Sequence, residues 1–192
     1  MRPLSTVLLA GALLASAPSP RAAVVRRVVD GDTLVVGRRE RVRLIGVDAP
    51  EIPHRDRAGE PFGPEAAEFT RSLADGETVR LGFDPEAGRT DRHGRTLAYV
   101  TLPDGRLLNL EIIRAGWAEA YHALAYERKA EFLAAERAAC EERLGLWAER
   151  HRPCRSGPLS GPADPRAVEG RPPQRGGASG LDAEPPSLHE AP

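Results

Sequence analysis

The chain has 192 residues, of which 41% are hydrophobic, and its 27 lysines and arginines nearly balance its 28 aspartates and glutamates. This length is sufficient for one domain with a buried core. Residues 24–150 alone carry a net charge of about −3, which excludes a domain that binds nucleic acid tightly through a broadly basic surface.

The first 23 residues have the layout of a secretory signal. Arg2 is followed by the apolar run Leu8 to Ala15, and small residues and prolines continue to Ala23. The apolar run is too short to span a bilayer. We predict that residues 1–23 are a signal peptide and that the mature protein is secreted or periplasmic, without membrane attachment. A disordered or anchoring N-terminus is the alternative.

Residues 24–150 have the pattern of one folded domain. Segments rich in β-branched residues between Gly and Pro turn signals predict strands, and apolar residues at helical spacing predict helices. In chain order, the predicted elements are strands Val24–Val29, Thr33–Val36 and Arg41–Val47, helix Pro64–Leu73, strands Thr78–Phe83 and Thr96–Leu102, and helices Asn109–Ala115 and Tyr121–Leu144. Asn109 is expected to cap its helix. This order favours a small closed barrel in an α+β domain.

The last stretch, residues 151–192, is rich in Pro, Gly, Ser, Arg and Ala and shows no hydrophobic periodicity. It has too little apolar material to offset the entropy of ordering, so we predict a flexible tail. In an oxidising compartment, Cys140 and Cys154 are expected to form a disulfide that pins the start of this tail to the last helix. Two unpaired thiols are the alternative.

Three short stretches concentrate carboxylates and arginines beside predicted strands. They are Asp-Gly-Asp-Thr at 30–33, Arg-Leu-Ile-Gly-Val-Asp-Ala-Pro-Glu at 43–51 and Asp-Arg-His-Gly-Arg at 91–95. Together they could hold a hard cation and a phosphodiester, whose hydrolysis needs positive charge and a group that activates water. Strict strand alternation puts Arg43 and Asp48 on opposite faces. A twist, a bulge or the end of the strand must therefore intervene.

The third stretch forms a glycine turn that places Arg95 at the entrance of a strand. His93 could carry a proton, but a lone histidine in an exposed turn is more often uninvolved. Among the tyrosines, Tyr99 lies inside a strand and is predicted to be a core residue. Tyr121 is the better candidate for stacking on a base.

In this combination and order, the motifs resemble the staphylococcal (thermonuclease-like) nuclease family. Gly63-Pro64-Glu65-Ala66 and Gly145-Leu146-Trp147 extend the resemblance, which covers residues 24–149. It implies a five-stranded OB-fold β-barrel with three helices. It also implies a monomeric nuclease that uses calcium to hydrolyse DNA and RNA, preferably single-stranded, to 3′-phosphate products.

The resemblance assigns the carboxylates of the site. Asp32 and Asp48 would bind calcium together with the backbone carbonyl of Ala49, where the family often has threonine. Glu51 would be the general base, or at least position the attacking water. From the residues alone, an all-oxygen site with two carboxylates could also take magnesium or manganese.

The resemblance also assigns the phosphate-binding residues. Arg43 and Arg95 would bind the scissile phosphate and stabilise its developing charge. Arg92 and His93 stand where the family has a lysine and a tyrosine beside the nucleotide phosphate, and they would bind substrate together with Tyr121.

Two other classes of protein remain open. A non-catalytic OB module that binds oligonucleotides or protein would be expected to have lost carboxylates or arginines of the site, whereas all of them are present here. A secreted structural or adhesion domain explains the signal and the tail but not the clustered charged motifs.

Overall fold

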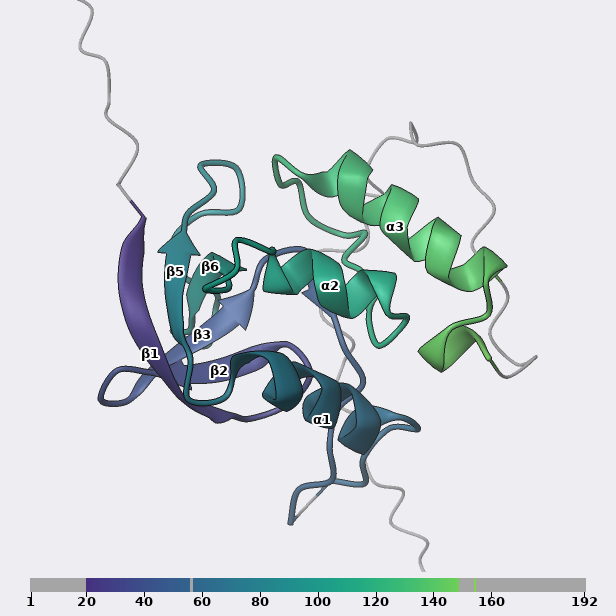
Figure 1. Cartoon of the computed structure of the whole chain (residues 1–192), viewed down its shortest axis with the longest axis horizontal. Coiled ribbons are helices and arrows are strands. Elements are labelled where there is room, and N and C mark those ends of the chain that lie inside the picture. Colours follow the sequence, from purple (N-terminus) through teal and green to yellow (C-terminus); the bar gives the residue numbers. More distant parts are fainter. Residues whose placement is uncertain (1–19, 56, 149–153, 155–192) are drawn as a thin grey trace, which may run out of the picture.

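Figure 1 shows the computed structural model, which describes residues 20–55, 57–148 and 154. Within these residues, five strands close into a barrel in the order β1-β2-β3-β6-β5, and two shorter strands, β4 and β7, pair separately. The barrel strands are β1 (Arg21–Val28), β2 (Thr33–Val36), β3 (Glu40–Leu44), β5 (Thr78–Gly82) and β6 (Thr96–Thr101). The short strands are β4 (Val47–Asp48) and β7 (Glu119–Ala120).

Alternating apolar residues of the strands fill the barrel. Their inward side chains are fully buried, among them Val25, Leu34, Val36, Val42 and Leu81. Burying such a side chain contributes about 1.5–3 kcal/mol, so the alternation determines which face each strand turns to the core. Neighbouring strands are antiparallel except β3 and β6, which run parallel.

The described residues contain three α-helices, α1 (Gly63–Ala74), α2 (Leu108–Arg114) and α3 (Lys129–Glu141), and a 3-10 turn at Gly145–Trp147. Helix α2 packs against β6 and lies between the barrel and α3, while α1 contacts β1 and α2 (Figure 1). The predicted α+β architecture, a five-stranded OB-fold barrel with three helices, is confirmed. None of the helices in the described part of the chain has the length and apolar character needed to cross a membrane.

The segment Arg41–Val47, predicted as one strand, is divided between β3 and β4. Strand β3 ends at Leu44, and the chain turns at Ile45 and Gly46. Gly46 has a φ of +73°, and a Cβ at this position would lie 2.6 Å from the ring of Tyr126. Only glycine fits this turn, so the strand cannot continue through it.

The helix predicted over Tyr121–Leu144 is observed only as α3, which starts later and ends earlier. The backbone ahead of α3 is engaged elsewhere, because the N–H of Tyr121 donates to the carbonyl of Gly46 (2.9 Å). Beyond α3, Arg143 has a φ of +57°, a left-handed conformation that no helix continues through. A tertiary contact therefore overrides the helical pattern at its start, and a left-handed residue stops it at its end.

A buried carboxylate, Asp84, joins the loop after β5 to the segment ahead of α3. Its Oδ2 accepts hydrogen bonds from the Tyr99 hydroxyl (2.6 Å) and the Glu127 N–H (2.8 Å), and its Oδ1 accepts one from the Glu86 N–H (2.8 Å). Burial alone would raise the pKa of Asp84, but these hydrogen bonds outweigh it and hold the pKa below its ordinary value. Tyr99 is thus a buried core residue, as predicted.

Asn109, predicted to cap the second helix, instead lies inside α2 and is fully buried, with Leu107 at the N-cap. Its Oδ1 accepts a hydrogen bond from the Val100 N–H (2.9 Å). Its Nδ2 donates to the carbonyls of Ile45 (2.9 Å) and Ala98 (3.2 Å). Asn109 therefore connects α2 and β6 to the turn between β3 and β4.

We expect Asn109→Leu to lower the free energy of unfolding by about 3 kcal/mol, because it removes the partners of the buried Val100 N–H and Ile45 carbonyl. Chemical denaturation of the full chain, followed by circular dichroism, measures this change. A loss below about 1 kcal/mol would show that these groups find other partners without cost.

One end of the folded region agrees with the prediction from sequence, and the other end differs from it. Cys140 and Cys154 form the predicted disulfide, with their Cα atoms 5.7 Å apart. At the other end, β1 includes residues 21–23, assigned by sequence to the signal, because these residues pair with β5. Residues 1–19 of the predicted signal, and all of the predicted tail except Cys154, lie outside the described residues.

Candidate active site

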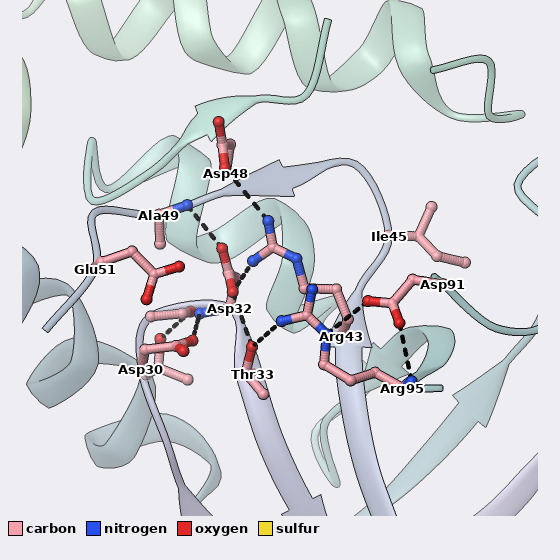
Figure 2. A network of polar contacts seen from close by, with 12 residues as sticks. Asp30, Asp32, Thr33, Arg43, Ile45, Asp48, Ala49, Glu51, Asp91 and Arg95 are labelled. Atoms are coloured by element: carbon pink, nitrogen blue, oxygen red, sulfur yellow. Dashed lines mark hydrogen bonds and ion pairs between the residues drawn. The ribbon is translucent and has the colours of Figure 1, made fainter. Parts of the chain in front are cut away.

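Thr33 and Arg43 occupy the outer face of the barrel at neighbouring positions of β2 and β3 (Figure 2). They lie opposite each other in the antiparallel register. Their neighbours Leu34 and Leu44 are buried in the core, so alternation turns Thr33 and Arg43 outward. Asp32 immediately precedes β2 and lies beside this pair.

Arg43 lies between two carboxylates. Its Nη1 forms an ion pair with Oδ1 of Asp32, and its Nη2 lies 3.3 Å from Oδ1 of Asp48. The Asp32 side chain is 5% exposed and that of Asp48 is 55% exposed. The turn at Ile45–Gly46 ends β3 and brings Asp48 back toward Arg43. The end of the strand is therefore what overcomes the alternation that separates the two residues.

Asp32 is also bonded to its neighbours. The Ala49 N–H donates to its Oδ2 (2.9 Å), and the Thr33 hydroxyl donates to its Oδ1 (3.1 Å). Gly31 permits this approach, since a Cβ there would lie only 2.6 Å from the Cβ of Ala49. The glycine of the Asp-Gly pair is thus required by packing.

Burial shapes the electrostatics of this cluster. Asp30 accepts a hydrogen bond from the Asp32 N–H (3.1 Å), and burial raises the pKa of Asp30 although nearby Arg43 opposes this shift. Burial lowers the pKa of Arg43, against the attraction of Asp48, but an arginine stays charged at neutral pH. The carboxylates are therefore clustered around a guanidinium that remains cationic.

Arg95 is held on the other side of Thr33 by Asp91. Its Nε donates to Oδ2 of Asp91 (2.6 Å), its backbone N–H donates to Oδ1 (2.9 Å), and its Nη1 donates to the Thr33 hydroxyl oxygen (3.3 Å). Burial alone would raise the pKa of Asp91, but the hydrogen bonds from Arg95 outweigh it and hold the pKa below its ordinary value. The Thr33 hydroxyl thus links Arg95 to Asp32.

Glu51 begins the loop after β4, and Figure 2 shows its carboxylate directed toward Asp32. Its carbonyl accepts a hydrogen bond from the Glu60 N–H (2.8 Å), and its own N–H donates to the Glu60 carboxylate (3.3 Å). Gly63 packs so closely that a Cβ there would lie 2.3 Å from the Glu51 carbonyl oxygen.

Glu51 faces a pocket of about 500 Å³. The other lining residues are Asp48, Ala49, Pro50, Arg57, Ala58, Glu60 and Glu119.

The three candidate substrate-binding residues lie at the edges of this cluster. Arg92 and His93 are exposed in the turn before Arg95, where Nε of Arg92 donates to Nε2 of His93 (3.1 Å). Tyr121 is half-buried and follows β7, the strand that pairs with β4. Within the described residues, none of the three has a hydrogen bond or ion pair with Arg43.

Thr33, Asp91 and Glu119 were not among the predicted site residues. Thr33 and Asp91 stand inside the sequence motifs, so the sequence could have indicated both. Thr33 is a polar residue directly after Asp32, and Asp91 is a carboxylate in the turn before Arg95. Glu119 has no such signal, because it reaches the pocket through the pairing of β7 with β4, where it lies opposite Asp48.

The carboxylates of the cluster supply oxygen atoms of the kind that bind metal ions. Across the described ranges, no group of three or more His, Cys, Asp or Glu side chains has the arrangement of a metal site. Asp32 and Asp48 nevertheless share one cation, the Arg43 guanidinium, so both reach a common positive charge. Carboxylate oxygens are ligands that a hard cation prefers, so the chemistry of Asp32 and Asp48 fits such an ion.

Comparison with known proteins agrees with the barrel fold. The family model described as "Staphylococcal nuclease homologue" matches residues 41–149. The thermonuclease of Staphylococcus intermedius is 43% identical over 100 residues, a match covering 50% of this chain and 58% of that protein. The thermonuclease of Staphylococcus hyicus is 35% identical over 127 residues, covering 64% and 73% of the two chains. Endonuclease YncB of Bacillus subtilis is 30% identical over 130 residues, covering 64% and 60%. The chain belongs to the staphylococcal nuclease family.

Proposed function

We propose that the protein is a metal-dependent nuclease that hydrolyses phosphodiester bonds of DNA and RNA, preferably single-stranded, to 3′-phosphate products. The observation that carries this proposal is the linked pair of guanidiniums: Arg43 and Arg95 both contact the Asp32–Thr33 unit, beside the Glu51 pocket. Two fixed arginines on one surface suit the oxygens of a phosphodiester. The nuclease names of the relatives favour the same substrate class.

Each charged group has a role in this proposal. Arg43 and Arg95 bind the scissile phosphate and stabilise the charge that grows on it. Glu51 accepts the proton of the attacking water. Asp32, Asp48 and the Ala49 carbonyl would hold a calcium ion, which would polarise the phosphodiester and offset its negative charge.

Residues at the rim would contact the rest of the substrate. Arg92 is exposed beside Arg95 and could contact a neighbouring phosphate, with His93 next to it in the same turn. Tyr121 offers an aromatic face for a base, which suits single-stranded substrates without sequence preference.

We also propose export to the cell exterior or the periplasm as a monomer, after cleavage of a signal peptide. The Cys140–Cys154 disulfide supports this, since such bonds persist in oxidising compartments. The pairing of residues 21–23 with β5 favours cleavage ahead of Arg21, because a cut after Ala23 would remove this part of β1.

Hydrolysis of a labelled single-stranded DNA by the mature protein, with calcium, with magnesium and with a chelator, tests the proposed function. We expect cleavage with calcium, none with the chelator, and none from an Arg95→Ala variant that melts at the wild-type temperature. Phosphatase treatment of products whose 5′ end is blocked by the label, so that only the 3′ end can lose a phosphate, identifies the 3′-phosphate. Binding without cleavage under every metal would indicate a non-catalytic OB module instead.

A further inference from the structure

Five exposed arginines gather on the strands and the hairpin turn that lead away from the active site. We call Arg26, Arg27, Arg38, Arg39 and Arg41 the arginine strip; all are exposed. Within the described part of the chain, none of them forms an ion pair. Among the described residues, the charges of the strip are therefore not held in ion pairs.

The strand register places the strip next to the active site. Thr33 lies opposite Arg43, and two residues further along β2, Val35 lies opposite both Arg41 on β3 and Arg27 on β1. Residues two apart on a strand share a face and are separated by about 7 Å. Arg41 and Arg43 therefore lie next to each other on the outer face of β3. Arg27 lies on the same face of the sheet, on β1 at the other side of β2.

A β-bulge in β1 increases the exposed charge. The pairing of β1 with β2 shifts register between Val25 and Arg27, while Val25 and Val28 are both buried. Strict alternation from Val25 would turn Arg27 inward and Val28 outward. The extra residue of the bulge lets Arg26 and Arg27 both face solvent.

Few negative charges oppose the strip. Strands β1, β2 and β3 contain one carboxylate, Glu40, which pairs with Arg21 and accepts a hydrogen bond from the Thr96 hydroxyl (2.8 Å). The whole chain has a net charge of −1, so this face is a local basic surface on a nearly neutral protein. Such a surface attracts a polyanion.

We propose that the arginine strip binds the phosphates of the nucleic-acid strand that extends beyond the active site, so that long strands bind better than short ones. This inference rests on the proposed function, in which Arg43 holds the scissile phosphate. A strand held at Arg43 presents its next phosphates along the same face of β3. The face of strands 2 and 3 binds oligonucleotides in OB folds, and arginine contacts to phosphate carry no sequence requirement.

The test compares a double variant, R27Q with R41Q, and a control double variant, R114Q with R137Q. The control loses the same charge from α2 and α3, on the side away from β1 (Figure 1). Substrates are oligodeoxythymidylates, one a trinucleotide and one of about 16 nucleotides, the upper end of the site size of an OB fold. For the wild type and the two double variants, KM is measured with both substrates across a series of salt concentrations.

We expect the strip variant to raise KM for the long substrate only and to reduce the slope of log KM against log salt by about 1.4, or about 0.7 for each lost phosphate contact. The control should leave both values near those of the wild type. Equal effects of the two variants, or equal effects on the two substrates, would overturn the proposal. So would an unchanged KM for the long substrate with loss of binding to phosphatidylglycerol vesicles, which would assign the strip to a membrane surface.

Failure of the proposed function gives a different result. If the wild type cleaves neither substrate, the nuclease proposal fails and KM has no meaning. Fluorescence anisotropy with the same oligonucleotides in chelator then decides on the strip alone. If the wild type binds the long oligonucleotide better than the short one and the R27Q, R41Q double variant loses this difference, the proposed role of the strip is supported. If the double variant binds like the wild type, that role is overturned.

Discussion

Glu51→Gln is expected to lower the turnover number on single-stranded DNA by a factor of roughly 10² to 10⁴, the range that general-base catalysis contributes. A glutamine keeps the size of the side chain and can still hydrogen-bond to water, but it cannot take up a proton at neutral pH. The loop that carries Glu51 is bonded to Glu60 through backbone groups, which the substitution leaves in place. The effect should therefore fall on turnover rather than on KM.

Glu60→Gln provides the matched control for this prediction. Glu60 lines the same pocket and would lose the same charge, while its amide oxygen could still accept the hydrogen bond of the Glu51 N–H. Single-turnover rates at saturating protein measure the chemical step for both variants. A rate for Glu51→Gln within a few-fold of that for Glu60→Gln would remove Glu51 from the mechanism.

Arg95→Lys is expected to lower the turnover number by roughly 10² to 10³, the loss seen when one fixed donor to a developing charge is removed. The guanidinium of Arg95 uses Nε for Asp91 and Nη1 for Thr33, which leaves other N–H groups for a phosphate. Lysine has a single nitrogen, so it cannot keep this anchor and bind a phosphate in the same geometry. The charge is retained but its position is lost.

The same reasoning applies to Arg43→Lys, because Arg43 contacts Asp32 and Asp48 through separate nitrogens. Arg137→Lys is the control for both variants, since Arg137 is exposed on α3 and has no role in the proposed site. Turnover on single-stranded DNA, measured beside melting temperatures, separates a misplaced charge from unfolding. Near-normal turnover of either lysine variant would mean that charge alone is sufficient at that position.

The strand pattern illustrates how far the sequence alone could predict this protein. Apolar alternation with turn signals located the barrel strands, because burying one face of each strand is the largest local stabilising effect. The charged motifs at 30–33, 43–51 and 91–95 also indicated which residues belong together. Their predicted roles in binding a cation, a phosphate and water remain predictions.

Other features depend on contacts between distant segments, and no local pattern encodes them. Asn109 has the residue type of a helix cap, yet Val100, Ile45 and Ala98 supply partners that only the folded barrel brings together. The helical spacing after Tyr121 likewise yields to a backbone hydrogen bond with Gly46.

By itself, the sequence determined the class of fold, the order of most elements and the residue types of the site, because periodicity, turn residues and charge act over short stretches of chain. The tertiary structure decided that Asp48 turns back to Arg43 and that Thr33, through Asp32, connects two guanidiniums. It also decided that arginines without an ion pair among the described residues line one face of the barrel. These depend on a left-handed glycine, a strand register and a bulge, whose conformations are selected by packing between segments far apart in the sequence.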